Sequence, residues 1–176
     1  MLRVLAFVVL MAAVSLSAQK PANPWASIEF LLGDWVGEGG GGPGQGSGEF
    51  SFHKDLDGKV IVRKNFAQYP GVRHDDLMIV YPDSGALRAI YFDSEGHVVN
   101  YSIQGAKDSA VFLSDVVPAA QRFRLTYQRT GPDTAGLKFE IAPPGKPDAF
   151  ATYIQAKARL VNAARSSASP TPHPTQ

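Results

Sequence analysis

Between residues 34 and 160 the chain is a series of short stretches in which apolar and polar residues alternate, each followed by a turn signal. Alternation with a period of two puts every second side chain on one face of a strand, and no stretch in this span has the spacing of a long helix. The expected strands cover residues 34–40, 49–54, 59–68, 76–81, 86–93, 97–104, 110–114, 122–128, 137–141 and 150–160. Short strands at such regular spacing are typical of an all-β sandwich or barrel. We favour an antiparallel up-and-down barrel of about ten strands, with the sandwich as the alternative.

The alternation also predicts which faces meet water. Along the last expected strand the smaller and more apolar residues share one face, and the other face carries Tyr153, Gln155, Lys157 and Arg159. On two earlier strands the same pattern assigns Arg122, Arg124, Lys138 and Glu140 to the solvent face.

The segment Leu31–Gly42, with the sequence LLGDWVGEGGGG, marks the start of the expected barrel. Just before it, the apolar residues of segment 25–32 fall on one face of about two helical turns, and Asn23 can cap them. We expect this short helix to plug one mouth of the barrel. Gly33 permits an abrupt turn into the first strand, and Trp35 is expected to seal the floor; an ordinary core tryptophan is the alternative.

The glycine run that follows predicts a loop rather than a nucleotide site. It lacks the lysine and hydroxyl residue of a Walker motif, and no strand–loop–helix pattern surrounds it.

The chain divides into four expected segments. Residues 1–18 have a basic start, the apolar run Val4–Val14 and small residues before Gln19, which together indicate a secretory signal peptide. The apolar run is shorter than the ~20 residues that span a bilayer, so no stable membrane insertion is expected after cleavage. Residues 19–27 form a leader, residues 28–161 the barrel, and residues 162–176 a disordered Pro/Ser/Thr-rich tail. The expected location is extracytoplasmic, in a periplasm or secreted.

Composition excludes several classes of function. The chain has no cysteine, which rules out thiolate metal sites and cysteine nucleophiles. Lys and Arg number 17 and Asp and Glu 16. One of those bases, Arg3, lies in the predicted signal peptide, so the mature chain is expected to be neutral. Without a block of like charge, a nucleic-acid partner is not expected.

The tripeptide Gly33-Asp34-Trp35 and the late Arg159 resemble the calycin arrangement of lipocalins, in which a G-x-W tryptophan packs against a last-strand arginine. The opening L-x-G-x-W-x-G-x-G, present as Leu31–Gly39, is more closely similar to nitrobindin-like barrels and to related secreted bacterial domains of unknown function. The hairpin Asp57-Gly58-Lys59 and the turn Tyr81–Gly85 also match. The resemblance covers about Ile28 to Leu160, and ten strands fit the nitrobindin barrel better than the eight of lipocalins. It implies that Gly33, Trp35 and Arg159 close the barrel, with Arg159 over or beside the Trp35 ring.

The resemblance would also imply haem, because nitrobindin-like proteins hold the iron through a histidine near the end of the barrel. This chain has no histidine between Val98 and Pro172, and its barrel histidines are His53, His74 and His97. We therefore expect no haem, and no other cofactor is predicted.

Two polar groups are candidates for chemistry. His74-Asp75-Asp76 could hold a metal or an acid–base pair, but neighbours on a strand point to opposite faces, so a solvated loop end is expected and no metal site is predicted. Asp93 and His97 flank a turn and could orient an imidazole; a hydrogen bond that closes the hairpin is the simpler expectation. No G-x-S-x-G nucleophile motif is present.

A ligand pocket needs mostly apolar walls with a few directed polar groups. The predicted ligand-binding residues are Arg63, Asn65, Tyr91, Tyr101 and Tyr127, which lie mid-strand among apolar neighbours. The first functional hypothesis is therefore an exported barrel that binds a small apolar or amphipathic molecule in its cavity. The alternatives are a structural or interaction domain with a filled barrel, and a hydrolase or isomerase that uses a rim histidine. An enzymatic role is the less favoured of these.

Overall fold

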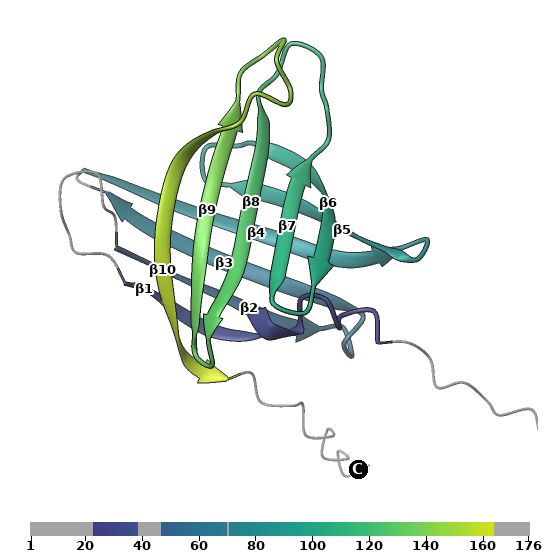
Figure 1. Ribbon diagram of the computed structural model, residues 1–176, viewed down its shortest axis with the longest axis vertical. Coiled ribbons are helices and arrows are strands. Elements are labelled where there is room, and N and C mark those ends of the chain that lie inside the picture. The colour runs from purple at the N-terminus through teal and green to yellow at the C-terminus, as the bar shows by residue number, and fades with distance from the viewer. Residues whose placement is uncertain (1–22, 39–46, 70, 164–176) are drawn as a thin grey trace, which may run out of the picture.

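The computed structural model describes residues 23–38, 47–69 and 71–163. Ten antiparallel strands form one closed barrel in which each strand pairs with its neighbours in the sequence (Figure 1). The strands are β1 Gly33–Glu38, β2 Ser47–Asp55, β3 Val60–Tyr69, β4 Val72–Asp83, β5 Ala86–Asp93, β6 Val98–Ala106, β7 Ser109–Ser114, β8 Arg122–Gly131, β9 Thr134–Ala142 and β10 Ala151–Ala163. The predicted fold class and strand count are confirmed, and the sandwich alternative is wrong.

The barrel closes where the first strand pairs with the last. Gly33 lies opposite Ala163 and Trp35 opposite Leu160, with a register shift between Asp34 and Trp35. Gly33 has a φ of 128°, a region that L-residues avoid, so the abrupt entry into β1 does require a glycine. Strand β10 reaches Ala163, two residues beyond the barrel boundary expected from the sequence.

A short N-terminal segment covers one end of the barrel. It consists of turns from Pro24 followed by the 3₁₀ helix η1, Glu29–Leu31, and the backbone N–H of Trp25 donates to Asn23 Oδ1 at 3.0 Å. Trp25, Ile28 and Leu31 are buried. The predicted plug is thus present, with one helical turn rather than two, and Asn23 caps the turn at Trp25 rather than η1, whose N-cap position is Ile28.

The plug is fixed to the strands by specific contacts. Trp25 Nε1 donates to the carbonyl of Gly58 at 3.0 Å, in the β2–β3 hairpin. Ser27 packs so closely on Gly105 of β6 that a Cβ there would lie 2.4 Å from the serine Cβ. The end that carries these contacts is called the closed end. The opposite end, with the β3–β4 and β5–β6 turns and the β7–β8 and β9–β10 connections, is called the open end.

Five aromatic side chains fill the barrel next to the plug. Trp35 is 2% exposed, its ring stacks on that of Phe50 at 5.8 Å, and its Nε1 donates to the Leu31 carbonyl at 2.8 Å. Phe52, Phe112 and Tyr127 complete the cluster through edge and tilted contacts. Trp35 therefore occupies the floor position expected for it.

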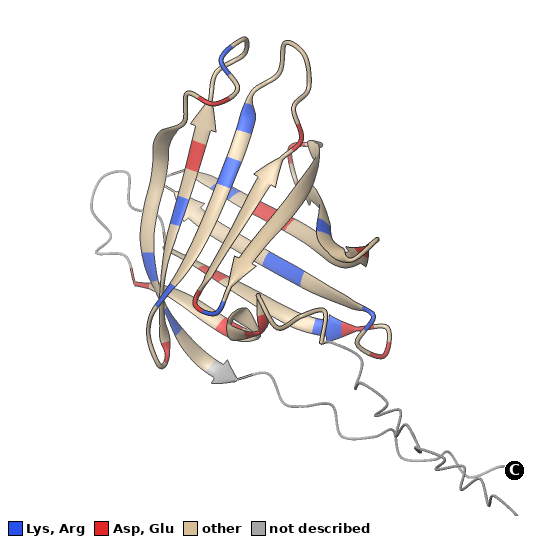
Figure 2. Cartoon of the chain, turned by 45° about the vertical axis from the view of Figure 1, so that its right-hand side comes forward, with Lys and Arg blue, Asp and Glu red and all other residues tan. Residues whose placement is uncertain are grey.

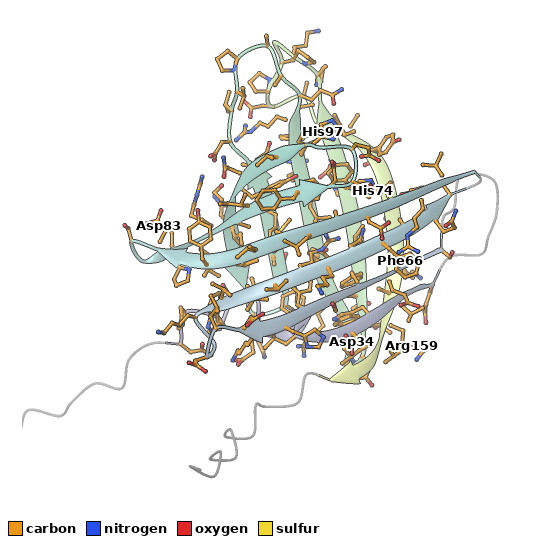
Figure 3. All side chains as sticks on the ribbon, turned by 180° about the vertical axis from the view of Figure 1, so that it is seen from behind. Asp34, Phe66, His74, Asp83, His97 and Arg159 are labelled. Atoms are coloured by element: carbon orange, nitrogen blue, oxygen red, sulfur yellow. The ribbon has the colours of Figure 1, made fainter. Side chains whose placement is uncertain are left out.

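Arg159 does not lie over Trp35, and that prediction was wrong. It pairs in register with Val36, its side chain is 54% exposed, and its Nε approaches Glu38 Oε1 at 3.5 Å on the outer wall (Figure 3). Leu160 faces Trp35, so the alternation of β10 must turn Arg159 outward. The residue belongs to the closing ladder through its backbone alone.

The outer wall carries charges of both signs, spread along the strands (Figure 2). The β8–β9 register confirms that the side chains of Arg122, Arg124, Lys138 and Glu140 point outward, as predicted. Glu140 is nevertheless buried beneath the side chains with which it pairs. In the part of the chain that the structure describes, no helix has the length and apolar character needed to cross a membrane. The predicted signal peptide, residues 19–22 of the leader, most of the glycine run and most of the predicted tail lie outside the described residues.

Candidate functional site

All five residues predicted to bind a ligand point into the barrel. Met78 of β4 lies opposite both Arg63 and Tyr91, which places those two side chains on the same interior face. Asn65 follows two residues after Arg63, Tyr101 lies opposite Ala89 of β5, and Tyr127 belongs to the aromatic cluster. The barrel thus joins residues from β3, β5, β6 and β8 in one interior region. Their role in binding stays a prediction.

Arg63 is the centre of this region. Its Nε donates to the Tyr127 hydroxyl at 2.9 Å, and its Nη1 pairs with Asp76. Asn65 Nδ2 donates to the second oxygen of Asp76 at 2.8 Å. The side chains of Arg63 and Asp76 are each only 5% exposed. A buried charge needs a partner, so this pair forms a neutral, hydrogen-bonded layer across the barrel.

Electrostatic interactions in this layer keep each of its titratable side chains in one protonation state. Burial alone would lower the pKa of Arg63, but Tyr127 and Asp76 raise it above its usual value. Burial raises the pKa of Tyr91 and of Tyr101 well above 10, and nearby Asp76 adds to both effects. These phenols therefore stay neutral and can donate hydrogen bonds, which suits the floor of a polar pocket.

His74 and its neighbours occupy the open end above this layer. The predicted loop end at His74-Asp75-Asp76 was wrong: these residues lie within β4, because that strand begins at Val72, which pairs with Tyr69 of β3. His74 and Asp76 point inward, and Asp75 points outward to Arg73. His74 Nε2 lies 3.1 Å from the Tyr91 hydroxyl, which ties the rim to the interior layer.

The β5–β6 turn completes the open end. Asp93 Oδ1 accepts from the backbone N–H of Glu95 at 3.0 Å and of His97 at 2.9 Å, and its Oδ2 lies 2.8 Å from His97 Nδ1. The expected hairpin-closing hydrogen bond is confirmed. Burial opposes ionisation of Asp93, but hydrogen bonds from the backbone and side chain of His97 lower its pKa below its ordinary value. An imidazole held in this way could act as a base, although the sequence offers no recognisable nucleophile motif beside it.

The facing wall of the open end is apolar. Strand β4 is separated from β9 by five places in either direction around the barrel, so the two lie on opposite sides. The inward residues of that opposite side near the open end include Phe123 and Phe139, whose rings stack at 5.9 Å. Val99 on β6 also points inward, opposite Tyr91. Nothing in the sequence marks these residues as site residues, because their apolar pattern is that of any core.

A pocket of about 220 Å³ opens at this rim. It lies between the start of β6, the end of β7 and the β7–β8 connection, and three of its lining residues, Val99, Ser114 and Phe123, also line the barrel interior. Its other lining residues are Val98, Asn100, Asp115, Val117, Ala120 and Gln121.

A larger hollow of about 430 Å³ lies elsewhere, on the outer wall of β1–β4. Most of its lining side chains point away from the barrel, including Asp34, Lys64 and Asp75. Positive and negative side chains are mixed there, and some are paired, such as Arg73 with Asp75. We place the candidate site at the open end because the interior polar groups converge there, whereas Asn65 is the one member of that group that lines the larger hollow.

Comparisons with known proteins do not assign the chain to a family. No protein-family model matches it, and no curated protein matches it either. The closed ten-stranded antiparallel barrel is compatible with a calycin-like fold.

Proposed function

We propose that this protein is an exported barrel that binds a small, partly apolar molecule at its open end. The observation that carries the proposal is a difference in solvent exposure between inward-facing side chains at the two ends of the barrel. At the closed end Phe50, Phe52 and Phe112 are buried, whereas Val99, Phe123 and Phe139 at the open end stay partly exposed. Apolar side chains that face a barrel interior and yet meet solvent mark a volume that a ligand can fill.

The two walls of the open end define the chemistry of that ligand. The side formed by β3–β5 offers Asn65, Tyr91 and His74 as hydrogen-bonding groups, and the opposite side offers the stacked rings of Phe123 and Phe139. The rim pocket of about 220 Å³ is smaller than the roughly 300–1,000 Å³ common for drug-sized ligands. We therefore propose a small amphipathic molecule, with its polar group toward β4.

The filled-barrel alternative has its own support. The closed half is packed with aromatic rings, and among the described residues every buried side-chain nitrogen or oxygen has a hydrogen-bond partner. An interior satisfied in this way needs no ligand to be stable. The ligand-binding role and the filled-barrel role therefore differ only in what occupies the open half of the barrel. An experiment that distinguishes them must probe that half.

A matched pair of variants provides that experiment. Val99→Arg places a charge inside the open end, whereas Val111→Arg places the same charge on the outer face, where Val111 pairs with Thr126. Protein purified from its own host is analysed by native mass spectrometry. We expect a bound small molecule on the wild type and on Val111→Arg and its loss from Val99→Arg. A wild-type protein without any bound molecule, or equal occupancy in both variants, would favour the filled barrel.

Haem is not the ligand that we propose. Among the described histidines only His74 points into the barrel, and its two ring nitrogens face Tyr91 and Glu95, while His53 lies on the outer wall beside Asp34. Titration with hemin should give no sharp Soret band. A band that disappears in His74→Gln would contradict this view.

Export is the remaining part of the proposal. It is supported by the apolar run Val4–Val14 and the small residues that follow. N-terminal sequencing of extracytoplasmic protein should begin at Ala18 or Gln19. An exported protein that retains Met1 would show that the segment is not a cleaved signal.

A further inference from the structure

One histidine and two carboxylates converge at the open end, and a second histidine lies next to the carboxylates. One ligand atom from each of His74, Asp93 and Glu95 lies within 4.8 Å of the others. His97 lies beside them, with its Nδ1 2.8 Å from Asp93 Oδ2 and 3.9 Å from Glu95 Oε2. Figure 3 shows His74 and His97 at the same end of the barrel.

The backbone holds these residues together. Asp76 pairs in register with Asp93, so His74, two residues earlier on β4, comes level with the β5–β6 turn. The N–H of Ser94 donates to the carbonyl of Asp75 at 2.9 Å and joins the turn to β4. The Asp93 carboxylate is fixed by the two turn N–H groups described above. Side chains on strand ends and on a closed turn keep their separations even when no metal ion is bound.

The outer contacts of His74 resemble those of a metal ligand. Its Nε2 faces the Tyr91 hydroxyl at 3.1 Å and Asp76 Oδ2 at 3.4 Å, and Asp76 is itself held by Arg63 and Asn65. A ligating histidine usually donates its second ring N–H to such a carboxylate, which fixes the ring and its tautomer. With the proton on Nε2, the lone pair of Nδ1 points toward Glu95 Oε1, 3.1 Å away.

We propose that His74, Asp93, Glu95 and His97 bind a divalent transition-metal ion at the open end of the barrel. In a tetrahedral Zn²⁺ site with bonds of about 2.0–2.1 Å, ligand atoms lie roughly 3.3–3.5 Å apart. Three separations within this group, 2.8, 3.1 and 3.9 Å, bracket that range, and the ligand atoms of His74, Asp93 and Glu95 all lie within 4.8 Å of one another. A mixed set of imidazole and carboxylate suits Zn²⁺ or its neighbours in the series, whereas Ca²⁺ and Mg²⁺ prefer oxygen ligands alone.

This site shares His74 with the polar wall proposed for the organic ligand, but a metal ion can bind to it when that ligand is absent. The four side chains belong to β4, the end of β5 and the β5–β6 turn, and the apolar wall with Phe123 and Phe139 is on the other side. Two separate ion pairs, His74 with Glu95 and His97 with Asp93, are the competing explanation of the same contacts. A titration with metal distinguishes the two.

The full-length protein is titrated with Zn²⁺ by calorimetry, and Co²⁺ is added in parallel to follow its visible absorption. We expect one equivalent of Zn²⁺ to bind and Co²⁺ to give the absorption of a tetrahedral site. The Glu95 side chain is 47% exposed, so the Glu95→Gln variant should fold normally. The His74→Gln variant removes a ligand near the interior. Each should weaken Zn²⁺ binding by at least about tenfold, since even outer contacts of metal ligands are worth about 10–100-fold.

His53→Gln is the matched control, because His53 also pairs with a carboxylate, Asp34, but on the outer wall. It should bind Zn²⁺ as the wild type does. The proposal is overturned if the wild type binds no Zn²⁺, or if Glu95→Gln binds it with unchanged affinity. Should His74→Gln fail to fold, Glu95→Gln decides alone.

Discussion

The two ends of the barrel are built from the same strands and yet differ in chemistry. From the closed to the open end, inward positions on β3 read Ile61, Arg63, Asn65, and those on β4 read Val80, Met78, Asp76, His74. On β5 the series is Leu87, Ala89, Tyr91, Asp93. On β3 and β5 the change from apolar to polar comes at the level of Met78, and on β4 it comes one inward position later, at Asp76. The closed end is thus a hydrophobic core with a plug, and the open end is a polar site supported by that core.

This difference separates stability from function within one domain. Apolar burial and close packing supply most of the stability of a fold, and here they are concentrated next to the plug. Polar and titratable groups cost free energy when they are buried unless they are partnered. The open end accepts them because one layer, Arg63 with Asp76, Asn65 and Tyr127, satisfies the charges at the boundary.

The largest effect is expected at the closed end. Trp35→Ala removes a buried ring that stacks on Phe50, and such truncations cost about 3–5 kcal/mol through lost burial and the cavity left behind. Phe139→Ala, at the half-exposed open end, should cost only about 1–2 kcal/mol, because solvent can enter the space. Urea denaturation of both variants measures the difference. Equal losses would show that the open end is packed as tightly as the closed end.

The sequence predicted the architecture because alternation and turn signals are local properties. The ten strands and the outward position of Arg124 follow from period two alone. His74 was a candidate for a metal site but was assigned to a solvated loop end, because its environment depends on the pairing of Asp76 with Asp93, which no local pattern reveals. Arg159 was misplaced because the family resemblance was preferred to the alternation of its own strand, which already turned it outward.

The second effect is expected at the boundary layer. Arg63→Met leaves the Asp76 carboxylate buried without its cation, and breaking a buried ion pair costs about 3–5 kcal/mol. Asn65 still donates to Asp76, so we expect the lower end, about 3 kcal/mol. Asp76→Asn in the same background should recover part of the loss, since residues in contact couple. Denaturation of the single and double variants tests this coupling. A double variant as unstable as the sum of its parts would show that the two charges do not act as a pair.

The third prediction concerns the loss of folding stability at acid pH, and whether it arises at the open end or on the outer wall. Hydrogen bonds from Arg124, at 2.6 and 2.9 Å, lower the pKa of the buried Glu140 below its ordinary value of 4.5, and Lys138 adds to this. A depressed folded-state pKa stabilises the protein above pH 4.5, and the contribution is lost as the pH falls through the lower value. Glu140→Gln should therefore be less stable at pH 7 and lose less between pH 5 and pH 3. If the unfolding free energies of the wild type and of Glu140→Gln fell by the same amount across this range, the acid sensitivity would arise elsewhere.

The smallest effect concerns Arg159, and it tests the closing ladder itself. Its side chain is half exposed, and its one ion pair is with Glu38 at 3.5 Å. Exposed pairs of this kind contribute about 0–1 kcal/mol, so Arg159→Ala should change the unfolding free energy by at most about 0.5 kcal/mol. Trp35 and Arg159 point to opposite faces of the wall, and their effects should add in the double variant. A coupling energy above about 0.5 kcal/mol would instead mean that the arginine reaches the ring in solution. The closed end would then depend on a cation as well as on apolar packing, and the contrast between the two ends would weaken.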